Sequence, residues 1–153
     1  MDPQEIVIEE VTTFSSEIAD AVRRLARQIG NNSQPLADED LQEIIDSPSS
    51  YLYLARDTNT GQVAGMVMVS VYRIPYTKKA YIDDLIVDES FRKRGIATQL
   101  MQTAVAIAKE KNAAYVDFTS RPRRAAGNTL YEKMGFKQRE TNVYRLTINY
   151  GEV

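Results

Sequence analysis

The sequence predicts an α/β domain in which helices cover a mixed, mostly antiparallel sheet. Apolar runs of strand length alternate with amphipathic stretches of helical period. Strand patterns dominate before residue 88, whereas helices and strands alternate after it, an order that combines hairpins with helix-connected parallel strands. A hydrophobic fraction of 43% in 153 residues suffices for one core, and no linker or repeat divides the chain. We therefore expect one domain over residues 1–153.

The N-terminal half contains strand and helix patterns with recognisable ends. Ser15 and Ser16 suit a helix N-cap, and Ile18, Val22 and Leu25 follow at helical spacing. Acidic residues open the next helical pattern, where they complement the helix dipole. The predicted elements are a strand at residues 5–11, helices at 16–29 and 36–45, and strands at 51–56, 62–74 and 80–87.

The C-terminal half begins with a long amphipathic helix. Its apolar residues from Ile96 to Ala108 repeat at helical spacing, directly after a basic turn that contains Gly95. Gly135 is a natural stop for a last helix, because glycine adopts the left-handed conformation that ends many helices. The predicted elements are a helix at residues 96–111, a strand at 114–119, an irregular basic loop at 120–127, a helix at 128–134 and one or two strands within 136–148.

The composition removes several kinds of chemistry. The chain has no cysteine, which excludes disulfides and thiolate nucleophiles. It has no histidine, the commonest general base and metal ligand, so we expect no metal, and catalysis must use carboxylates, tyrosine or water. The net charge of −2 argues against general nucleic-acid binding. No apolar run approaches the roughly 18 residues of a membrane span, and the acidic N-terminus is unlike a signal peptide, so we expect a cytoplasmic protein without membrane association.

The turn from Arg92 to Thr98 is the most informative feature of the chain. It lies where a strand gives way to a helix, and its cations precede Gly95, which permits a tight turn and a close approach to a ligand. The unpaired N–H groups and the dipole of a helix N-terminus favour phosphate. The alternative is an ordinary solvated basic turn, because the segment matches neither a dinucleotide-binding fingerprint nor a Walker loop.

Two motifs in this order resemble the GCN5-related N-acetyltransferase (GNAT) superfamily. The sequence RKRGIA at 92–97 fits the family signature Arg/Gln-x-x-Gly-x-Gly/Ala, and YIDDLIV at 81–87 resembles the central strand that precedes it. The later sequence LYEKMGF at 130–136 resembles the family's LYEKxGF segment, so the resemblance covers residues 64–146. It implies a GNAT-type single domain with a splayed pair of parallel strands, and acetyl-CoA (coenzyme A) as cosubstrate without a metal.

The resemblance also implies roles for individual residues. In this family acetyl-CoA lies where two parallel strands splay apart. The backbone of the central strand would bind the pantetheine arm, the N–H groups of the basic turn would hold the pyrophosphate, and the last helix would approach the thioester end. The implied cofactor-binding residues are Leu85, Ile86, Val87, Arg92, Lys93, Arg94, Gly95, Ile96, Ala97, Thr98, Asn128 and Tyr131.

A basic loop before the last helix resembles the SRPxR segment of one bacterial subgroup. Its arginines, Arg121 to Arg124, could reach the cofactor or an anionic acceptor, and a solvated loop is the alternative. Ala125 and Gly127 stand where the subgroup usually has an acidic residue and alanine. We expect this departure to loosen the start of the helix.

The implied reaction is attack of a primary amine on a thioester carbonyl, with expulsion of a thiolate. An alkylamine with a pKa near 10 is almost fully protonated at pH 7, so a base must remove its proton. Asp83 is the first candidate, because several family members carry a functional glutamate there; Asp84 and water are the alternatives, and so is a purely structural role for either aspartate. As neighbours on a strand, the two should point to opposite faces.

Tyr131 is the expected general acid for the departing thiolate, since a phenol is protonated at neutral pH. The alternative is a tyrosine that only packs the helix. A backbone N–H near Leu85 is expected to meet the carbonyl oxyanion.

The resulting hypothesis is an N-acetyltransferase that moves an acetyl group from acetyl-CoA to a primary amine by direct attack in a ternary complex. The acceptor, a small molecule or a peptide, is not identified by the sequence. Met66 and Met68 could line its pocket, although we expect them in the core. A non-catalytic acyl-CoA sensor of the same fold is the alternative function, and residues 144–150 are a candidate edge strand in a homodimer.

Overall fold

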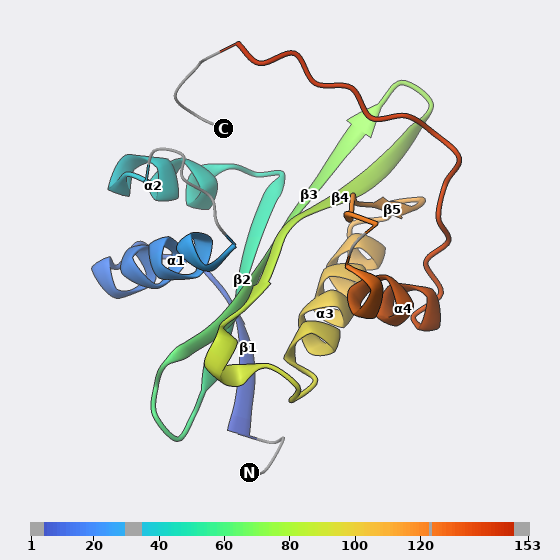
Figure 1. Cartoon of the computed structure of the whole chain (residues 1–153). Coiled ribbons are helices and arrows are strands. Elements are labelled where there is room, and N and C mark those ends of the chain that lie inside the picture. Colours follow the sequence, from blue (N-terminus) through green and yellow to red (C-terminus); the bar gives the residue numbers. More distant parts are fainter. Residues whose placement is uncertain (1–4, 30–34, 123, 149–153) are drawn as a thin grey trace.

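The structure is a computed structural model that describes residues 5–29, 35–122 and 124–148 (Figure 1). Its five strands form one sheet in the order β1-β2-β3-β4-β5, antiparallel except for the parallel pair β4 and β5. The predicted α/β class with a mixed sheet is confirmed. The elements are β1 (Ile6–Glu10), α1 (Ser16–Gln28), α2 (Asp38–Asp46), β2 (Ser50–Asp57), β3 (Val63–Ile74), β4 (Thr77–Val87), a 3₁₀ turn (Glu89–Phe91), α3 (Ile96–Glu110), β5 (Val116–Asp117) and α4 (Ala125–Lys133).

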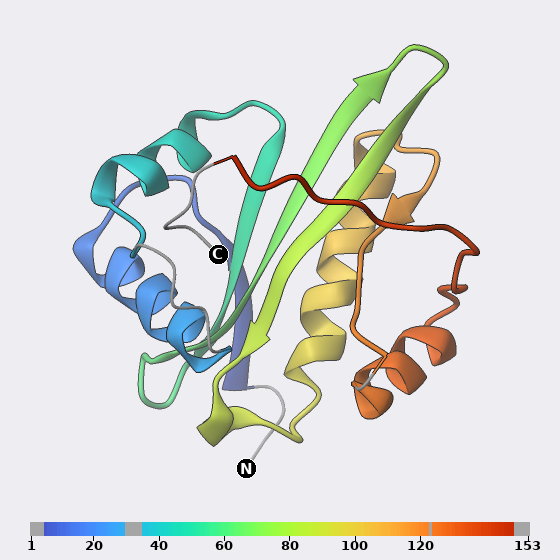
Figure 2. The same ribbon diagram turned by 45° about the horizontal axis from the view of Figure 1, so that its top comes forward.

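The sheet separates two hydrophobic cores. Helix α3, with α4 beside it, covers one face, and α1 and α2 cover the other (Figures 1 and 2). The first core, under α3, contains the fully buried side chains of Val67, Val69 and Leu100. The second core, under α1 and α2, contains those of Leu25 and Leu41. Because each such side chain contributes about 1.5–3 kcal/mol when buried, both faces hold the central strands firmly.

The two N-terminal helices begin as the sequence predicts. The Ser15 hydroxyl accepts a hydrogen bond from the backbone N–H of Ile18 at 3.1 Å, which caps α1. In α2 the carboxylate of Asp40 accepts from the N–H of Ala37 at 2.9 Å, and Asp38 forms an ion pair with Arg23 at 2.6 Å. The acidic start of α2 therefore serves the helix itself. Residues 30–32, directly after the first predicted helix, lie outside the described residues.

A β-bulge interrupts β4 in the middle of the sheet. Met68 of β3 lies opposite Asp83, whereas Met66 lies opposite Ile86, so β4 takes three steps where β3 takes two. Asp84, inside the bulge, has a left-handed φ of 52°. Strand alternation therefore breaks between Asp83 and Ile86, and the opposite orientation of Asp83 and Asp84 stays a prediction.

The bulge also changes which residues of β4 point to each side of the sheet. Before it, Ala80 and Ile82 belong to the first core. After it, Leu85 and Val87 pack against the first core, while Ile86 lies in the second. Even-numbered residues of β4 therefore face α3 before the bulge, and odd-numbered residues face it after the bulge.

Three predictions in the C-terminal part need correction. Strand β5 spans two residues instead of the predicted 114–119, because β4 bends at its bulge and offers β5 a short ladder. Helix α4 starts at Ala125, within the predicted loop, because the N–H of Asn128 already bonds the carbonyl of Arg124. The final strands predicted within 136–148 are absent: residues 137–148 are exposed and pair with no described strand. None of the helices in the described ranges is long and apolar enough to cross a membrane.

Candidate active site

The sheet opens between β4 and β5. The two strands pair only at Ala80 with Val116 and at Tyr81 with Asp117, yet β4 continues to Val87. The edge of β4 from residue 82 onward therefore has no described strand beside it on the β5 side. The strand pair splays, as the resemblance implies.

The backbone of β4 presents polar groups to this opening. Upstream of the bulge, Ala80 donates its N–H to the carbonyl of Tyr115, the residue before β5; downstream, Asp88 donates its N–H to the carbonyl of Ala64 on β3. Because backbone groups alternate in direction along a strand, Leu85 and Val87 direct theirs away from β3, toward the opening. The carbonyl of Ile86 points the other way, toward Gly65 on β3. The backbone N–H and carbonyl groups of Leu85 and Val87 are therefore placed to bind an extended chain, whereas those of Ile86 are not.

The N-terminus of α3 lies at the end of this strand and is left open. Gly95 occupies its N-cap position with φ 75° and no capping side chain, and the first helical bond runs from Gln99 N–H to the Gly95 carbonyl. The N–H groups of Ile96, Ala97 and Thr98 precede that bond, so the helix itself offers them no acceptor. The tight turn predicted at Gly95 is confirmed, and Lys93 before it is also left-handed, with φ 65°.

The charges around this helix start are the reverse of those that stabilise a helix. Helices α1 and α2 carry acidic residues in their first turns, whereas α3 carries none and follows Arg92, Lys93 and Arg94. Cations at the positive end of a helix dipole repel it. Arg94 packs over the Phe91 ring at 5.1 Å, and Arg92 donates to the Val87 carbonyl at 3.3 Å, so both are held near the turn. The arrangement favours a bound anion.

A buried carboxylate fixes the chain just before this turn. Asp88 accepts hydrogen bonds from the N–H and hydroxyl of Ser90 at 2.9 and 2.8 Å, and from the Gln28 amide at 3.2 Å. Burial alone would raise the pKa of Asp88, but these bonds and the nearby charge of Arg24 lower it overall. Asp88 is therefore an anion that ties the 3₁₀ turn to α1.

Gly65 is a site residue that the sequence reasoning missed. A Cβ added there would lie 2.9 Å from the Ile86 carbonyl oxygen and 3.2 Å from Leu100 Cδ1. The bulged part of β4 and the first turns of α3 thus approach β3 closely at this glycine. The available signal was a lone glycine inside a strand pattern, which often marks a close backbone approach.

Tyr131 lies on α4 and packs on the same face of the sheet as α3. Its half-buried ring packs against the first core, as Leu85 and Val87 do. It meets the ring of Phe118, which follows β5, edge to face at a centroid distance of 4.7 Å. Burial raises the pKa of the Tyr131 hydroxyl, and the charge of Arg124 offsets part of that rise. The phenol is thus protonated at neutral pH.

One carboxylate marks the opposite side of the sheet, and a second lies next to it in the bulge. Asp83, two residues from Tyr81 along β4 and before the bulge, lies on the face that α1 and α2 cover, since Ile82 faces α3. Partial burial, and next the charge of Asp84, raise the pKa of Asp83; partial burial also raises the pKa of Asp84. Both remain accessible to solvent. The structure forms no ion pair between either aspartate and Arg92 among the described contacts.

The remaining candidate residues have structural partners. The Asn128 amide donates to the Arg121 carbonyl at 3.2 Å, which holds the basic loop against α4. Arg121 and Arg124 are exposed at the start of that helix. Met66 is buried in the second core and Met68 packs against it, so the expectation of core positions is confirmed.

The comparisons with known proteins agree with this geometry. The model of the acetyltransferase (GNAT) family matches residues 19–136. Among solved structures, an aminoglycoside acetyltransferase from an uncultured soil metagenomic sample, in complex with sisomicin, has a TM-score of 0.83 at 18% identity and covers 95% of this chain and 98% of its own. Glucosamine-6-phosphate N-acetyltransferase from Arabidopsis thaliana has a TM-score of 0.77 at 16% identity, with 92% and 98% covered.

A third similar structure, an aminoglycoside N-acetyltransferase in complex with CoA, has a TM-score of 0.72 at 17% identity and covers 93% of this chain and 94% of its own. No curated protein sequence matches the chain. At these identities the structural matches establish the fold alone. The family match covers most of the chain, and the family uses acetyl-CoA for acetyl transfer. The protein therefore belongs to the acetyltransferase (GNAT) family.

Proposed function

We propose that this protein is an N-acetyltransferase that moves an acetyl group from acetyl-CoA to a primary amine, by direct attack within a ternary complex. The observation that carries the proposal is the junction of two features: the open edge of β4 beyond Tyr81, and the uncapped, cation-flanked N-terminus of α3 at its end. One offers hydrogen bonds to an extended chain and the other offers N–H groups to a diphosphate. Coenzyme A has both parts.

The residues at this junction fit the cosubstrate. The N–H groups of Ile96, Ala97 and Thr98 would hold the diphosphate, with Arg92, Lys93 and Arg94 supplying charge and Gly95 leaving the approach clear. Leu85 and Val87 would bind the pantetheine arm through their outward backbone groups. Acetyl-CoA would supply the activated acetyl group as a thioester.

The proton-transfer groups lie on the two faces of the sheet. Asp83, on the α1 and α2 side, would accept the proton of the incoming amine, and its raised pKa brings it closer to that of the amine. Tyr131, on the α3 and α4 side, would donate its hydroxyl proton to the departing thiolate. In this proposal the amine would reach the acetyl group from the α1 and α2 side, and Tyr131 would meet the thiolate from the α3 and α4 side.

The acceptor is proposed to be a cationic amine. Asp83 and Asp84 are accessible carboxylates on adjacent positions, and their charge would attract an ammonium group before it loses its proton. Two of the similar structures are aminoglycoside acetyltransferases by name, and an amine-bearing acceptor of this kind is consistent with the proposal.

Thermal unfolding with acetyl-CoA tests the cofactor site. At a hundredfold excess over Kd, ligand binding should stabilise the protein by about 2.7 kcal/mol and raise Tm measurably. Gly95→Glu should abolish the rise, because it places a carboxylate where the diphosphate binds. Gly61→Glu is the matched control, since Gly61 has φ 76° and open space around it but lies in the β2–β3 turn. A shift that survives in Gly95→Glu would contradict the proposal.

Release of free CoA in the presence of a panel of amines tests catalysis. We expect turnover with at least one cationic amine, and none with Asp83→Asn at neutral pH. Tight binding of acetyl-CoA by a protein that releases no CoA with any amine would favour the alternative function, a non-catalytic acyl-CoA sensor.

A further inference from the structure

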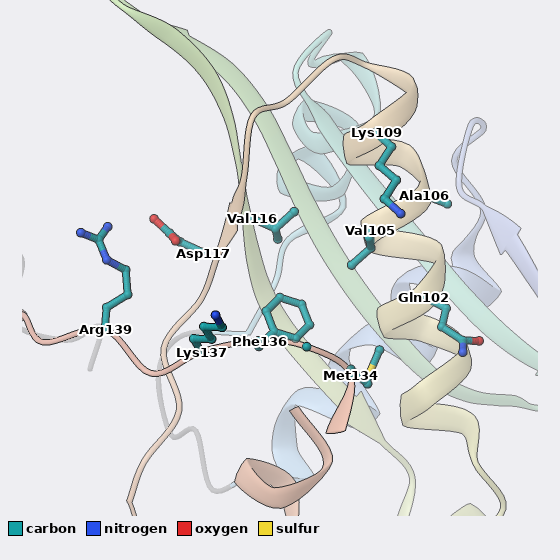
Figure 3. A pocket seen from close by; sticks show the side chains of 11 residues that line it. Gln102, Val105, Ala106, Lys109, Val116, Asp117, Met134, Phe136, Lys137 and Arg139 are labelled. Carbon is teal, nitrogen blue, oxygen red and sulfur yellow. The ribbon is translucent and has the colours of Figure 1, made fainter. Parts of the chain in front are cut away.

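The strand β5 has few contacts that hold it in place. It spans two residues, and among the described strands only β4 pairs with it. On its α3 side it borders a groove of about 660 Å³, which Figure 3 shows between Val116, Val105 and Phe136. A segment with few packing contacts opens easily, so the position of β5 depends on what holds its other side.

The other side of β5 carries a carboxylate. Val116 points toward α3, whereas Asp117 points away from it (Figure 3). The ammonium of Lys79 on β4 forms an ion pair with Asp117, and the nitrogen and the carboxylate oxygen are 3.6 Å apart. The side chains of Lys79 and Asp117 are only 20% and 29% exposed, so salt and water screen this pair less than an ordinary surface pair.

The same ammonium lies against two aromatic rings. Lys79 Nζ is 5.8 Å from the ring centroid of Tyr72, which is the partner of Lys79 in the register of β3 and β4. It is 5.6 Å from the ring centroid of Tyr115, the residue before β5. Both distances lie within the roughly 6 Å over which an aromatic face attracts a cation. One ammonium therefore joins β3, β4 and the β5 segment.

Lys79 lies beside the point at which β4 and β5 part. Tyr81 and Asp117 form the last pair between the two strands, and the opening begins beyond them. Phe118 follows Asp117 directly and meets the ring of Tyr131 edge to face at a centroid distance of 4.7 Å. A shift of β5 would therefore change the width of the opening and move the ring that packs on Tyr131.

We propose that Lys79 is a positioning residue whose ammonium clamps β5 to β3 and β4, and so fixes the β5 side of the opening for acetyl-CoA. The clamp follows from the ion pair and the two ring contacts alone. Its effect on acetyl-CoA rests on the proposed function, because the cosubstrate must bind in that opening. Lys79 takes no part in proton or acetyl transfer and acts through Asp117 and Phe118.

Hydrogen exchange in the protein without cosubstrate tests the clamp. Two backbone hydrogen bonds join β4 to the β5 segment beside Lys79. Ala80 donates its N–H to the Tyr115 carbonyl at 3.0 Å, and Ala114 donates its N–H to the Lys78 carbonyl at 2.7 Å. Lys79→Met removes the ammonium and keeps most of the apolar stem, so the protection of both amides should fall by about tenfold.

Two further variants and an internal reference make this result specific. Lys79→Arg keeps a cation at the same position and should retain most of the protection. Lys78→Met is the matched control, because Lys78 is the neighbouring lysine of β4 and forms no ion pair within the described ranges. The Val71 amide, which donates to the Ser49 carbonyl at 2.9 Å outside this ladder, is the reference. Unchanged protection of the two ladder amides in Lys79→Met, or an equal loss at Val71, would overturn the clamp.

Calorimetric titration with acetyl-CoA tests the positioning role. The Kd of Lys79→Met should rise by roughly three- to tenfold, because fewer molecules hold the opening in its competent form. Lys79→Arg and Lys78→Met should bind like the wild type. If Lys79→Met loosens β5 and still binds acetyl-CoA with unchanged Kd, the positioning role is wrong and the acetyltransferase proposal stands. If the wild type itself binds no acetyl-CoA, the proposed function fails and the positioning role fails with it, whereas the exchange data alone decide the clamp.

Discussion

Gly65→Ala tests how the packing of β3 shapes the opening beside β4. Gly65 has no left-handed φ, so an added methyl group meets its neighbours without backbone strain at the residue itself. Its Cβ would lie 2.9 Å from the Ile86 carbonyl oxygen, closer than real Cβ atoms come, and 3.2 Å from Leu100 Cδ1. Because one of these neighbours is backbone, β4 or β3 must move.

The expected cost follows from two opposing effects. Overpacking of a core costs about 1–3 kcal/mol, while loss of glycine's freedom in the unfolded chain returns about 0.4–1 kcal/mol. We therefore expect Gly65→Ala to lower the free energy of unfolding by about 1–2 kcal/mol, and Tm by roughly 2–8 °C. The displaced carbonyl of Ile86 lies between Leu85 and Val87, so the affinity for acetyl-CoA should fall as well.

Gly127→Ala is the matched control for this prediction. It makes the same substitution at another glycine without left-handed φ, but there the Cβ would lie 3.6 Å from the Tyr131 hydroxyl oxygen, an ordinary contact. Alanine is favoured over glycine inside a helix by about 0.8–1 kcal/mol, so this variant should be at least as stable as the wild type. Thermal melts of the apo proteins and calorimetric titration with acetyl-CoA measure both effects. Unchanged Tm and unchanged affinity in Gly65→Ala would refute the close approach.

Three further predictions concern the base, the acid and a helix cap. Burial and, next, the charge of Asp84 raise the pKa of Asp83, and Asp83 must be ionised to act as a base. Asp84→Asn should therefore move the acidic limb of the pH profile of kcat/KM to lower pH. If that limb does not move, the base is another group. Tyr131→Phe should lower kcat by about 100-fold with little change in the Kd of acetyl-CoA, and an unchanged kcat would leave Tyr131 a packing residue. Ser15→Ala should cost about 1 kcal/mol in a denaturant melt, since it removes the α1 cap, whereas Ser16→Ala, one position later, should cost much less.

Local signals in the sequence predicted the parts of the fold that depend on local chemistry. Ser15 caps α1, Gly95 is left-handed at the start of α3, and Gly135, with φ 99°, ends α4. Each of these positions requires a particular residue type, so the residue found there indicates the local structure. The turn before α3 was recognisable for the same reason, while its role in holding the cofactor stays a prediction.

Features that depend on distant contacts were beyond the sequence reasoning. Asp84 is an ordinary strand residue by pattern, and only the pairing of its neighbours Asp83 and Ile86 with Met68 and Met66 of β3 places it in a bulge. The apolar pattern at 143–148 does resemble a strand, but a strand exists only where a partner edge is within reach. The roles of Asp83, Tyr131 and Asn128 stay predictions, which the variants described above test.

The bulge in β4 contains one residue more than its ladder with β3 requires. If Asp84 were deleted, Asp83 would stay opposite Met68 and Ile86 opposite Met66, so the side chains beyond the bulge would keep their faces and the backbone of Leu85 and Val87 would still point away from β3. The deletion would instead remove the left-handed step at Asp84, and with it the bend and added twist that a bulge gives its strand. The shortened protein should therefore fold around the same two cores with a straighter β4, and its affinity for acetyl-CoA should fall, whereas a deletion in the β2–β3 turn should leave that affinity unchanged.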